Sequence, residues 1–344
     1  MPVIDRTDPE QMKAYKSFLD SVFDASFLQD PRWAKVHNNL KAEYVTVQDN
    51  GGNILAAATV YIRPILLGHC LLYVNRGPIC RAPSVEIVQR LIKEMKPLCK
   101  QYKAFAVRFD PNWPYSEEMT EAFQKAGFHV RGRGFTKRDL VMSRKTMRFH
   151  LNGRTMEELM ASFKTRTRRD INKSLRSDLV LEEGFTPEHL DVFMKLLDIT
   201  AERDKISHKP RSFFEAIAEN FTHDEVRLYL VRKDDAWLSG AVAVNYSGRL
   251  FYYHSGSSNE LRSLCPNAFL QYQLISWAVE SNCKIYDMGG IIRTDPEDGL
   301  YLFKSGYCTE ELEEYLGELD YPVKKLQYRS FIQAYSLMQK LRSR

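Results

Sequence analysis

Two residues of this chain could carry proton transfer and charge stabilisation: Asp110 and Lys304. Asp110 ends the apolar segment AFAVRFD, and Pro111 favours an extended turn after it, so we expect a carboxylate at a strand end that orients or deprotonates an attacking amine. Lys304 follows a glycine-broken loop after the predicted strand KIYDM, where its fixed charge could stabilise an oxyanion. Each has an ordinary alternative, because Asp before Pro is a common turn and most lysines lie on the surface.

A run of basic residues, KTRTRRDINKSLR, falls in a helix that we expect at 156–176. The helical face predicted to bind phosphate contains Lys164, Arg168, Arg169, Lys173 and Arg176. Between residues 131 and 176 there are fourteen Lys or Arg residues against four acidic ones, a net charge of +10 in a chain of net charge +5. A charge run is often a solvated helix surface, but this imbalance favours a phosphate-rich partner, either RNA or a nucleotide.

Several kinds of chemistry have no sequence signature here. The chain lacks a G-x-x-x-x-G-K-[ST] phosphate loop, a G-x-G-x-x-G turn, an H-E-x-x-H motif and a G-x-S-x-G elbow. Its six cysteines are widely separated and its eight histidines have no metal-ligand spacing. We therefore expect no metal site and no cofactor.

The order of predicted elements is repeated in the two halves of the chain, which indicates two similar α/β lobes related by duplication. The first half is predicted to contain helices at 9–23, from Asp30 onward, at 84–101 and at 116–125, an antiparallel three-strand meander at 42–79, and strands at 104–110 and 138–143. The second half is predicted to contain helices at 156–176, 187–204, 210–220 and 267–281, a meander at 226–257, and strands at 179–183 and 284–288. A last helix is expected at 323–341.

Membrane insertion is not expected. The longest apolar runs, 54–62 and 65–74, are well below the roughly 20 residues that a membrane helix needs, and the first twenty residues are too charged for a signal peptide. We expect a cytoplasmic protein that acts as a monomer.

Six segments, taken together and in order, resemble the FemABX family of aminoacyl-tRNA-dependent peptidyltransferases. They are FLQDPRWAKVH, YVNRGPI, RFDP, SGSSNE with PNAFLQYQLISWA, YDMGG and GLYLFKSGY. The resemblance implies an α/β (α+β) fold of two tandem lobes of the N-acetyltransferase fold with mixed, largely antiparallel sheets. The first lobe would comprise 1–147 and 319–344, with a returning C-terminal helix, and the second 148–318.

The same resemblance implies roles for individual residues. Asp110 would lie near the acceptor amine and Lys304 would stabilise the oxyanion. Phe303, directly before Lys304, would bind the substrate, and Arg211 in HKPRSFF would contact precursor phosphates. The basic run would engage tRNA phosphates.

Two further positions are assigned less directly. Tyr252 and Tyr253 fall in an aromatic strand that would line the substrate cleft. The family's lysine four residues after Trp33 is His37 here, so either Lys35 or His37 is expected to take the phosphate contact.

The implied reaction moves a small amino acid (Ala, Ser or Gly) from aminoacyl-tRNA to the side-chain amine of residue three of UDP-MurNAc-pentapeptide or lipid II. A short connection at 202–210 replaces the helical arm of larger members, which resembles the compact type that uses the soluble acceptor. Two alternatives stay open: a CoA-dependent N-acyltransferase, against which stands the wrong ending of QKAGFH as a pyrophosphate turn, and a non-catalytic RNA-binding protein.

Overall fold

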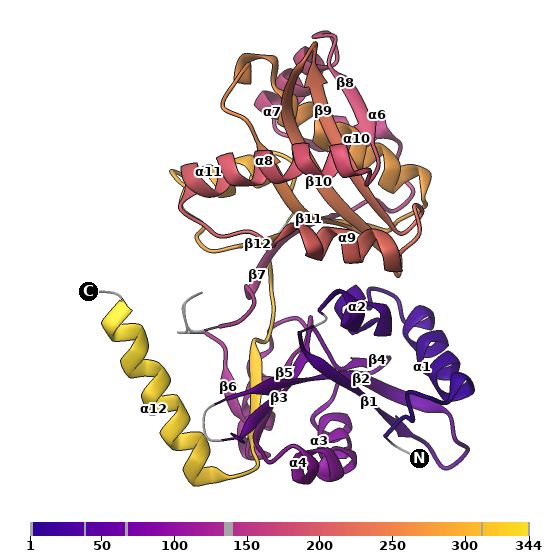
Figure 1. Ribbon diagram of the computed structural model, residues 1–344, viewed down its shortest axis with the longest axis vertical. Helices are drawn as coiled ribbons and strands as arrows, with labels where there is room; N and C mark the ends of the chain where they lie inside the picture. Colours follow the sequence, from indigo (N-terminus) through magenta and orange to yellow (C-terminus); the bar gives the residue numbers. More distant parts are fainter. Residues whose placement is uncertain (1–2, 38, 66–67, 134–139, 311, 343–344) are drawn as a thin grey trace. The chain divides into compact units, whose positions relative to one another are not determined.

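The computed structural model describes residues 3–37, 39–65, 68–133, 140–310 and 312–342. The chain divides into two compact units (Figure 1). Unit 1 comprises Met1–Arg144 and Glu314–Arg344, and unit 2 comprises Lys145–Glu313. Each is described by itself below.

Unit 1 is a seven-stranded sheet with helices on both faces. Its strands are β1 (Lys41–Gln48), β2 (Ile54–Pro64), β3 (Cys70–Asn75), β4 (Ile79–Cys80), β5 (Ala104–Asp110), β6 (His129–Arg131) and β14 (Glu318–Pro322). Its helices are α1 (Pro9–Ser21), α2 (Pro31–Val36), α3 (Val85–Glu94), α4 (Lys96–Gln101), α5 (Glu117–Lys125) and α12 (Lys325–Arg342), with a 3₁₀ turn at Phe27–Gln29. Figure 1 shows α3 and α4 on one face of this sheet and α1 and α2 on the other.

The strand order in unit 1 is β1-β2-β3-β5-β14-β6, and β4 pairs with β2. The predicted antiparallel meander of β1, β2 and β3 is confirmed. Strand β5 runs parallel to β3, whereas β14 pairs antiparallel with both β5 and β6. The sheet is therefore mixed, and the residues that follow unit 2 in the chain supply one of its inner strands.

Capping residues set the ends of several helices in unit 1. The Asp30 carboxylate accepts a hydrogen bond from the Arg32 amide at 2.8 Å, and Pro31 begins α2 as predicted. The single helix expected at 84–101 is wrong, because the chain forms α3 and α4 with a break at Met95. Pro97 explains the break, since it has no amide hydrogen and cannot continue a helix interior.

One expected strand of unit 1 is also wrong. Residues 138 and 139 lie outside the described residues, and Leu140–Ser143 form no strand. The next strand, β7 (Lys145–His150), begins unit 2. The Ser143 carbonyl instead accepts a hydrogen bond from Arg76, at 2.7 Å.

Unit 2 is also built on a seven-stranded sheet, in the order β13-β7-β12-β11-β10-β9-β8. Its strands are β7, β8 (Val180–Glu183), β9 (Val226–Lys233), β10 (Ala236–Tyr246), β11 (Arg249–Ser257), β12 (Ile285–Ile291) and β13 (Glu313–Glu314). Its helices are α6 (Met156–Ser162), α7 (Thr165–Ser174), α8 (Pro187–Asp204), α9 (Arg211–Asn220), α10 (Pro266–Glu280) and α11 (Gly299–Ser305), with a 3₁₀ turn at Arg262–Leu264.

The order of elements in unit 2 repeats that of unit 1. An antiparallel meander (β9, β10, β11) is followed by α10 and then by β12, which runs parallel to β11. In unit 1 the meander is followed by α3 and α4 and then by β5, parallel to β3. The predicted mixed, largely antiparallel α/β architecture is confirmed.

The helix expected at 156–176 is two helices, α6 and α7. Phe163 between them has extended backbone (φ −72°, ψ 156°), and its buried ring lies 5.7 Å from that of Phe149 and 5.3 Å from that of Tyr307. Arg168 donates to the carbonyl oxygens of Phe163 (2.5 Å) and Ala161 (3.1 Å) and so caps the end of α6. Burial of one aromatic ring therefore breaks the helix.

None of the helices formed by the described residues is long and apolar enough to cross a membrane.

Candidate functional site

Asp110 is a buried, oriented carboxylate at the end of β5, with 2% of its surface exposed. Tyr73 donates its hydroxyl to Oδ2 at 3.1 Å, and Arg76 donates Nη1 to Oδ1 at 3.4 Å. Burial and the Asp110 charge raise the pKa of Tyr73 well above its usual range, so its hydroxyl keeps the proton that it donates. Asp110 is therefore buried and held by two hydrogen bonds, unlike the carboxylate of an exposed turn.

Sequence reasoning did not select Tyr73 and Arg76, although both stand in the segment YVNRGPI. The parallel pairing of Asn75 with Asp110 brings the end of β3 beside the end of β5. The Arg76 guanidinium also lies 5.0 Å from the centre of the Tyr315 ring. Arg76 lines a cavity of about 480 Å³ in unit 1 whose wall also includes Asn112 and Trp113, close in sequence to Asp110.

Lys304 is in the last turn of α11, with 6% of its surface exposed, so the reading of an ordinary surface lysine is wrong. Its ammonium donates to the Gly290 carbonyl at 2.9 Å. Asp298 caps the helix by accepting from the Tyr301 amide, so Lys304 is fixed on a short helix that follows the loop after β12. Gly289 (φ +79°) lies at an irregularity in the pairing of β12 with β7, beside the ammonium.

Tyr252 and Tyr253 lie on β11, where a register shift in its pairing with β10 makes Tyr253 an extra residue. Burial raises the pKa of both tyrosines, so both hydroxyls are neutral near pH 7. Tyr253 contacts the ring of His254 at 4.2 Å, whereas Tyr252 packs against the core of unit 2. Phe303 packs against that core too, with its ring 5.6 Å from that of Tyr307.

Lys35 and His37, the two candidates for one phosphate contact, lie at the end of α2 in unit 1. Lys35 is exposed, and the partly buried His37 ring makes edge contacts with Trp33 (6.2 Å) and Tyr61 (6.1 Å). Lys35 is therefore the more accessible of the two side chains.

Arg211 begins α9 in unit 2 and bridges to α8. Its Nε donates to Glu215 Oε1 at 2.7 Å and its Nη2 to the Pro187 carbonyl at 3.1 Å, while Nη1 pairs with Asp191. The predicted phosphate ligand is thus already held by two carboxylates, and a phosphate would have to compete with them.

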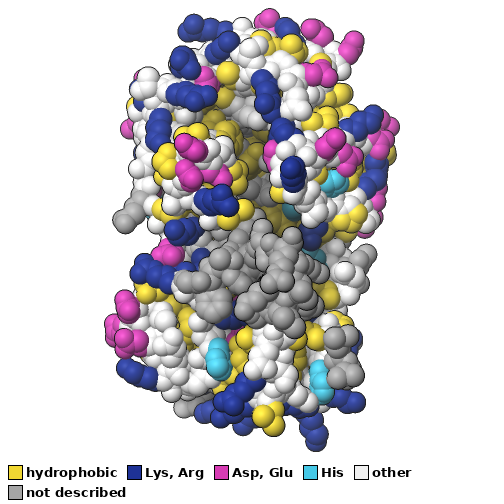
Figure 2. Space-filling view, turned by 90° about the vertical axis from the view of Figure 1, so that its left-hand side faces the viewer, with side chains coloured by type: hydrophobic (Ala, Val, Ile, Leu, Met, Phe, Trp, Pro, Cys, Tyr) yellow, Lys and Arg dark blue, Asp and Glu magenta, His cyan; other side chains and the backbone are white. Residues whose placement is uncertain are grey.

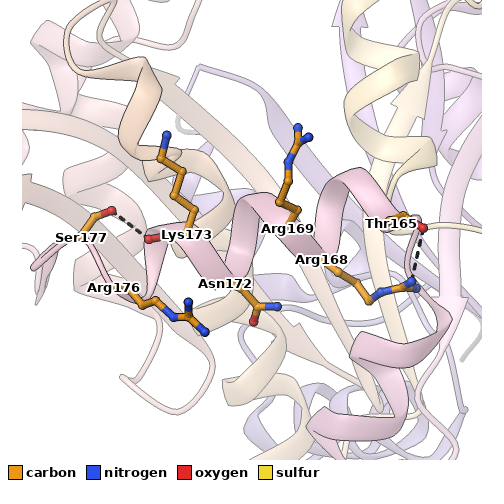
Figure 3. Close-up of a pocket in the computed structure, with 7 residues that line it drawn as sticks. All are labelled: Thr165, Arg168, Arg169, Asn172, Lys173, Arg176 and Ser177. Atoms are coloured by element: carbon orange, nitrogen blue, oxygen red, sulfur yellow. Dashed lines mark hydrogen bonds between the residues drawn. The ribbon is translucent and has the colours of Figure 1, made fainter.

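The basic helix α7 borders an open cavity of about 600 Å³. The cavity is lined by Thr165, Arg168, Arg169, Asn172, Lys173, Arg176 and Ser177. Figure 3 shows Arg168, Asn172 and Arg176 pointing to one side of the helix and Arg169 and Lys173 to the other. Lys164 does not line it, because its ammonium bonds Ser305 Oγ at 3.1 Å.

The charges along α7 are only partly balanced. Asp170 lies within ion-pair distance of Arg166 (3.8 Å) and Arg169 (3.5 Å). Within the part of the chain that the structure describes, no carboxylate lies at that distance from Lys173 or Arg176. On the face drawn in Figure 2, Lys and Arg side chains are spread among hydrophobic and acidic ones.

Among the described residues, no cluster of His, Cys, Asp or Glu could hold a metal ion. The six cysteines are free thiols. Burial raises the pKa of Cys80 to about 12 and that of Cys283 to about 11, so neither is a thiolate nucleophile near pH 7.

The architecture is that of two tandem lobes of the N-acetyltransferase fold. The crystal structure of FemX matches with a TM-score of 0.84 at 23% identity and covers 96% of this chain and 99% of its own. A tandem GNAT protein from the clavulanic acid biosynthesis pathway matches with a TM-score of 0.56 at 11% identity, over 93% and 97% of the two chains. The predicted fold is confirmed.

The chain belongs to the FemAB family, whose model matches residues 11–234 and 231–336. It is 29% identical to the UDP-N-acetylmuramoylpentapeptide-lysine N(6)-alanyltransferase of Weissella viridescens, over 93% of this chain and 96% of the relative. It is 24% identical to the lipid II:glycine glycyltransferase of Staphylococcus epidermidis, over 91% and 92%. The family predicted from the sequence is confirmed.

Proposed function

We propose that this protein is an aminoacyltransferase that moves a small amino acid (Ala, Ser or Gly) from aminoacyl-tRNA to the side-chain amine of residue three of a peptidoglycan precursor. The observation that carries this proposal is the near full-length match to relatives named for adding alanine to the lysine of UDP-N-acetylmuramoylpentapeptide and glycine to lipid II. The product would be the first bond of an interpeptide bridge.

The reaction needs no external energy source, because the ester of the donor is already activated. The acceptor amine attacks the ester carbonyl carbon, a C–N bond forms, and the bond to the ribose oxygen breaks. The amine loses one proton and the released ribose hydroxyl gains one. Catalysis then consists mainly of positioning and charge stabilisation.

Asp110 is proposed to orient the acceptor amine and to receive its proton. Its contacts with Tyr73 and Arg76 support the orienting role, because they fix both carboxylate oxygens. Lys304 is proposed to stabilise the tetrahedral oxyanion, and its burial in unit 2 supports this role, since a charge acts more strongly where water is excluded. No metal or covalent intermediate is required.

For the acceptor we favour soluble UDP-MurNAc-pentapeptide. Helices α8 and α9 are joined only by residues 205–210, so no helical arm is inserted there, as the sequence predicted. The match to the Weissella viridescens enzyme also extends over almost all of that protein. Lys35 or His37 in unit 1, and Arg211 in unit 2, are the proposed diphosphate contacts.

For the donor we favour aminoacyl-tRNA, on the strength of α7. Arg169, Lys173 and Arg176 present charge to an open cavity, where the phosphates of an RNA backbone would find partners. Arg168 contributes less, because its guanidinium caps α6.

The test is to incubate the protein with UDP-MurNAc-pentapeptide and total aminoacylated tRNA and to read the product by mass spectrometry. We expect the acceptor to gain the mass of one small amino acid, which identifies the residue, and deacylated tRNA to give no product. A product only with lipid II would correct the acceptor. A product that requires acetyl-CoA, or RNA binding without any transfer, would overturn the proposal in favour of the two alternatives.

A further inference from the structure

The N-terminal end of α7 is fastened to the C-terminal end of α11, within unit 2. The Lys164 amide donates to the Gly306 carbonyl at 2.9 Å, and the Lys164 ammonium donates to Ser305 Oγ at 3.1 Å. Just outside these contacts, Thr309 Oγ1 donates to the Ser162 carbonyl at 3.2 Å. The basic helix and the helix of Lys304 thus share one contact region.

Gly306 lies close to Thr167 of α7. A Cβ atom there would lie 2.2 Å from Thr167 Oγ1 and 3.2 Å from the Phe303 carbonyl. The glycine has an ordinary helical φ of −69°, so its lack of a side chain is required for space and not for backbone conformation. A larger residue requires Thr167 to move, either by rotation of its side chain or by a shift of α7 away from α11.

A shift of α7 relative to α11 would reach Lys304 directly. The amides of Tyr307 and Cys308 both donate to the Lys304 carbonyl, so residues 304–308 form one hydrogen-bonded turn. The Lys304 ammonium in turn bonds the Gly290 carbonyl. Moving the end of α11 would therefore move the lysine, and a misplacement of about 1 Å in an active site can lower a rate about 100-fold.

The residue at the start of α7, Lys164, supports a role for this helix end in the contact with α11. Lys164 is the N-cap and makes no side-chain capping bond, and a cation at a helix N-terminus is unfavourable to the helix itself. The helix that it begins is about 15 Å long and presents Arg169 and Lys173 farther along.

We propose that Gly306 is a positioning residue for Lys304: it lets α7 seat on α11, so that donor phosphates bound along α7 fix the lysine that stabilises the oxyanion. The proposal rests on the proposed function and adds to it a route by which donor binding prepares the site. RNA that rigidifies α7 would also rigidify the turn at 304–308.

The experiment compares Gly306→Ala with the double variant Gly306→Ala/Thr167→Ala, using the full chain in the transfer assay. Gly306→Ala is expected to lower kcat at least 10-fold, with the affinity for deacylated tRNA and the KM for the acceptor within 2-fold of wild type. The second substitution removes the Thr167 hydroxyl and is expected to recover most of kcat. In a hydrogen-exchange measurement, tRNA should slow exchange at Tyr307 and Cys308 in the wild type.

Each outcome either supports the proposed role of Gly306 or contradicts it. Wild-type kcat in Gly306→Ala, or a low kcat that Thr167→Ala does not recover, would overturn the proposal, as would tRNA that leaves exchange at Tyr307 and Cys308 unchanged. If Gly306→Ala does not fold, Lys164→Met is the second test. A fall in kcat that Lys164→Arg restores would support the coupling of α7 to Lys304. An unchanged kcat would contradict it. A wild-type protein without transfer activity would instead refute the proposed function.

Discussion

Arg108 and Asp320 form a bidentate ion pair in the interior of unit 1. Nε donates to Oδ1 at 2.6 Å and Nη2 to Oδ2 at 2.7 Å, with both side chains almost fully buried. Tyr328 on α12 donates its hydroxyl to the same carboxylate at 2.7 Å, and Glu318 lies 3.0 Å from Arg108 Nη1. Burial alone would lower the pKa of Arg108, but the charges of Asp320 and Glu318 outweigh it and raise that pKa. The pair joins β5 to β14.

Replacing Asp320 by Asn should strongly destabilise unit 1, because it leaves the Arg108 charge buried without its bidentate partner. Breaking a buried pair in this way costs about 3–5 kcal/mol. Chemical denaturation measures the loss. The control is Glu121→Gln, which removes an exposed i,i+4 partner of Lys125 and should change stability little. Equal effects of the two substitutions would contradict the structural role of the pair.

Replacing Lys304 by Met should lower kcat about 10²–10³-fold in a folded protein, the loss typical of removing one oxyanion donor. The steady-state rate of transfer from charged tRNA measures it. The matched control is Lys195→Met, at an exposed position of α8, which should keep wild-type turnover. Near wild-type turnover in Lys304→Met would refute the oxyanion role.

Replacing Lys173 or Arg176 by Met should weaken tRNA binding and flatten its salt dependence. Each lost phosphate contact lowers the slope of log K against log[salt] by roughly 0.7–0.9. Filter binding of tRNA at several salt concentrations measures the slope, and Lys195→Met controls for the change in net charge. A slope equal to that of the control would remove α7 from the RNA contact.

Replacing Gly256 by Ala should destabilise unit 2, because its Cβ would lie 2.5 Å from the carbonyl carbon of Leu196 on α8. Overpacking of this kind costs about 1–3 kcal/mol. Gly299 is the matched control, since a Cβ there meets nothing within 4 Å. Thermal unfolding of the two variants should separate them clearly, and similar melting temperatures would show that α8 can shift at little cost.

His254 should make stability fall in acid. Burial, together with Lys209 and His208, lowers its pKa to about 3, and among the described residues its Nε2 has no hydrogen-bond partner. The unfolded chain takes up this proton near pH 6.5 and the folded chain does not. The free energy of unfolding therefore falls by about 1.4 kcal/mol per pH unit below 6.5, down to about pH 3.

The His254→Phe variant isolates this contribution. Other groups titrate alike in both proteins, so the difference between their unfolding free energies should change between pH 7 and pH 5. Urea denaturation at the two pH values measures it. Parallel pH dependences would mean that folding does not lower the pKa of the imidazole.

The sequence predicted best those features of the fold that contacts between neighbouring residues determine. The N-cap at Asp30 before Pro31 follows from local chemistry, and so does the strand that ends at Asp110. The break at Phe163 has no Pro or Gly to signal it, because it results from packing against Phe149 and Tyr307, which lie 14 and 144 residues away in the sequence.

The candidate site, too, could be predicted from the sequence only in part. Asp110 could be selected from its place before Pro111, but its partners Tyr73 and Arg76 lie 37 and 34 residues away. The burial of Lys304 could not be read from its neighbours, because the Gly290 carbonyl that holds it comes from another element. The roles assigned to these residues stay predictions.

Strand β14 has a consequence for how the protein is made. Unit 2 is one continuous stretch, whereas the strand between β5 and β6 is synthesised only after all of unit 2. A nascent chain that stops before Glu318 leaves one edge of β5 open and Arg108 without its carboxylate. On the ribosome, the second unit can therefore complete its fold before the first, and the open edge of unit 1 is what a chaperone would have to protect until translation ends.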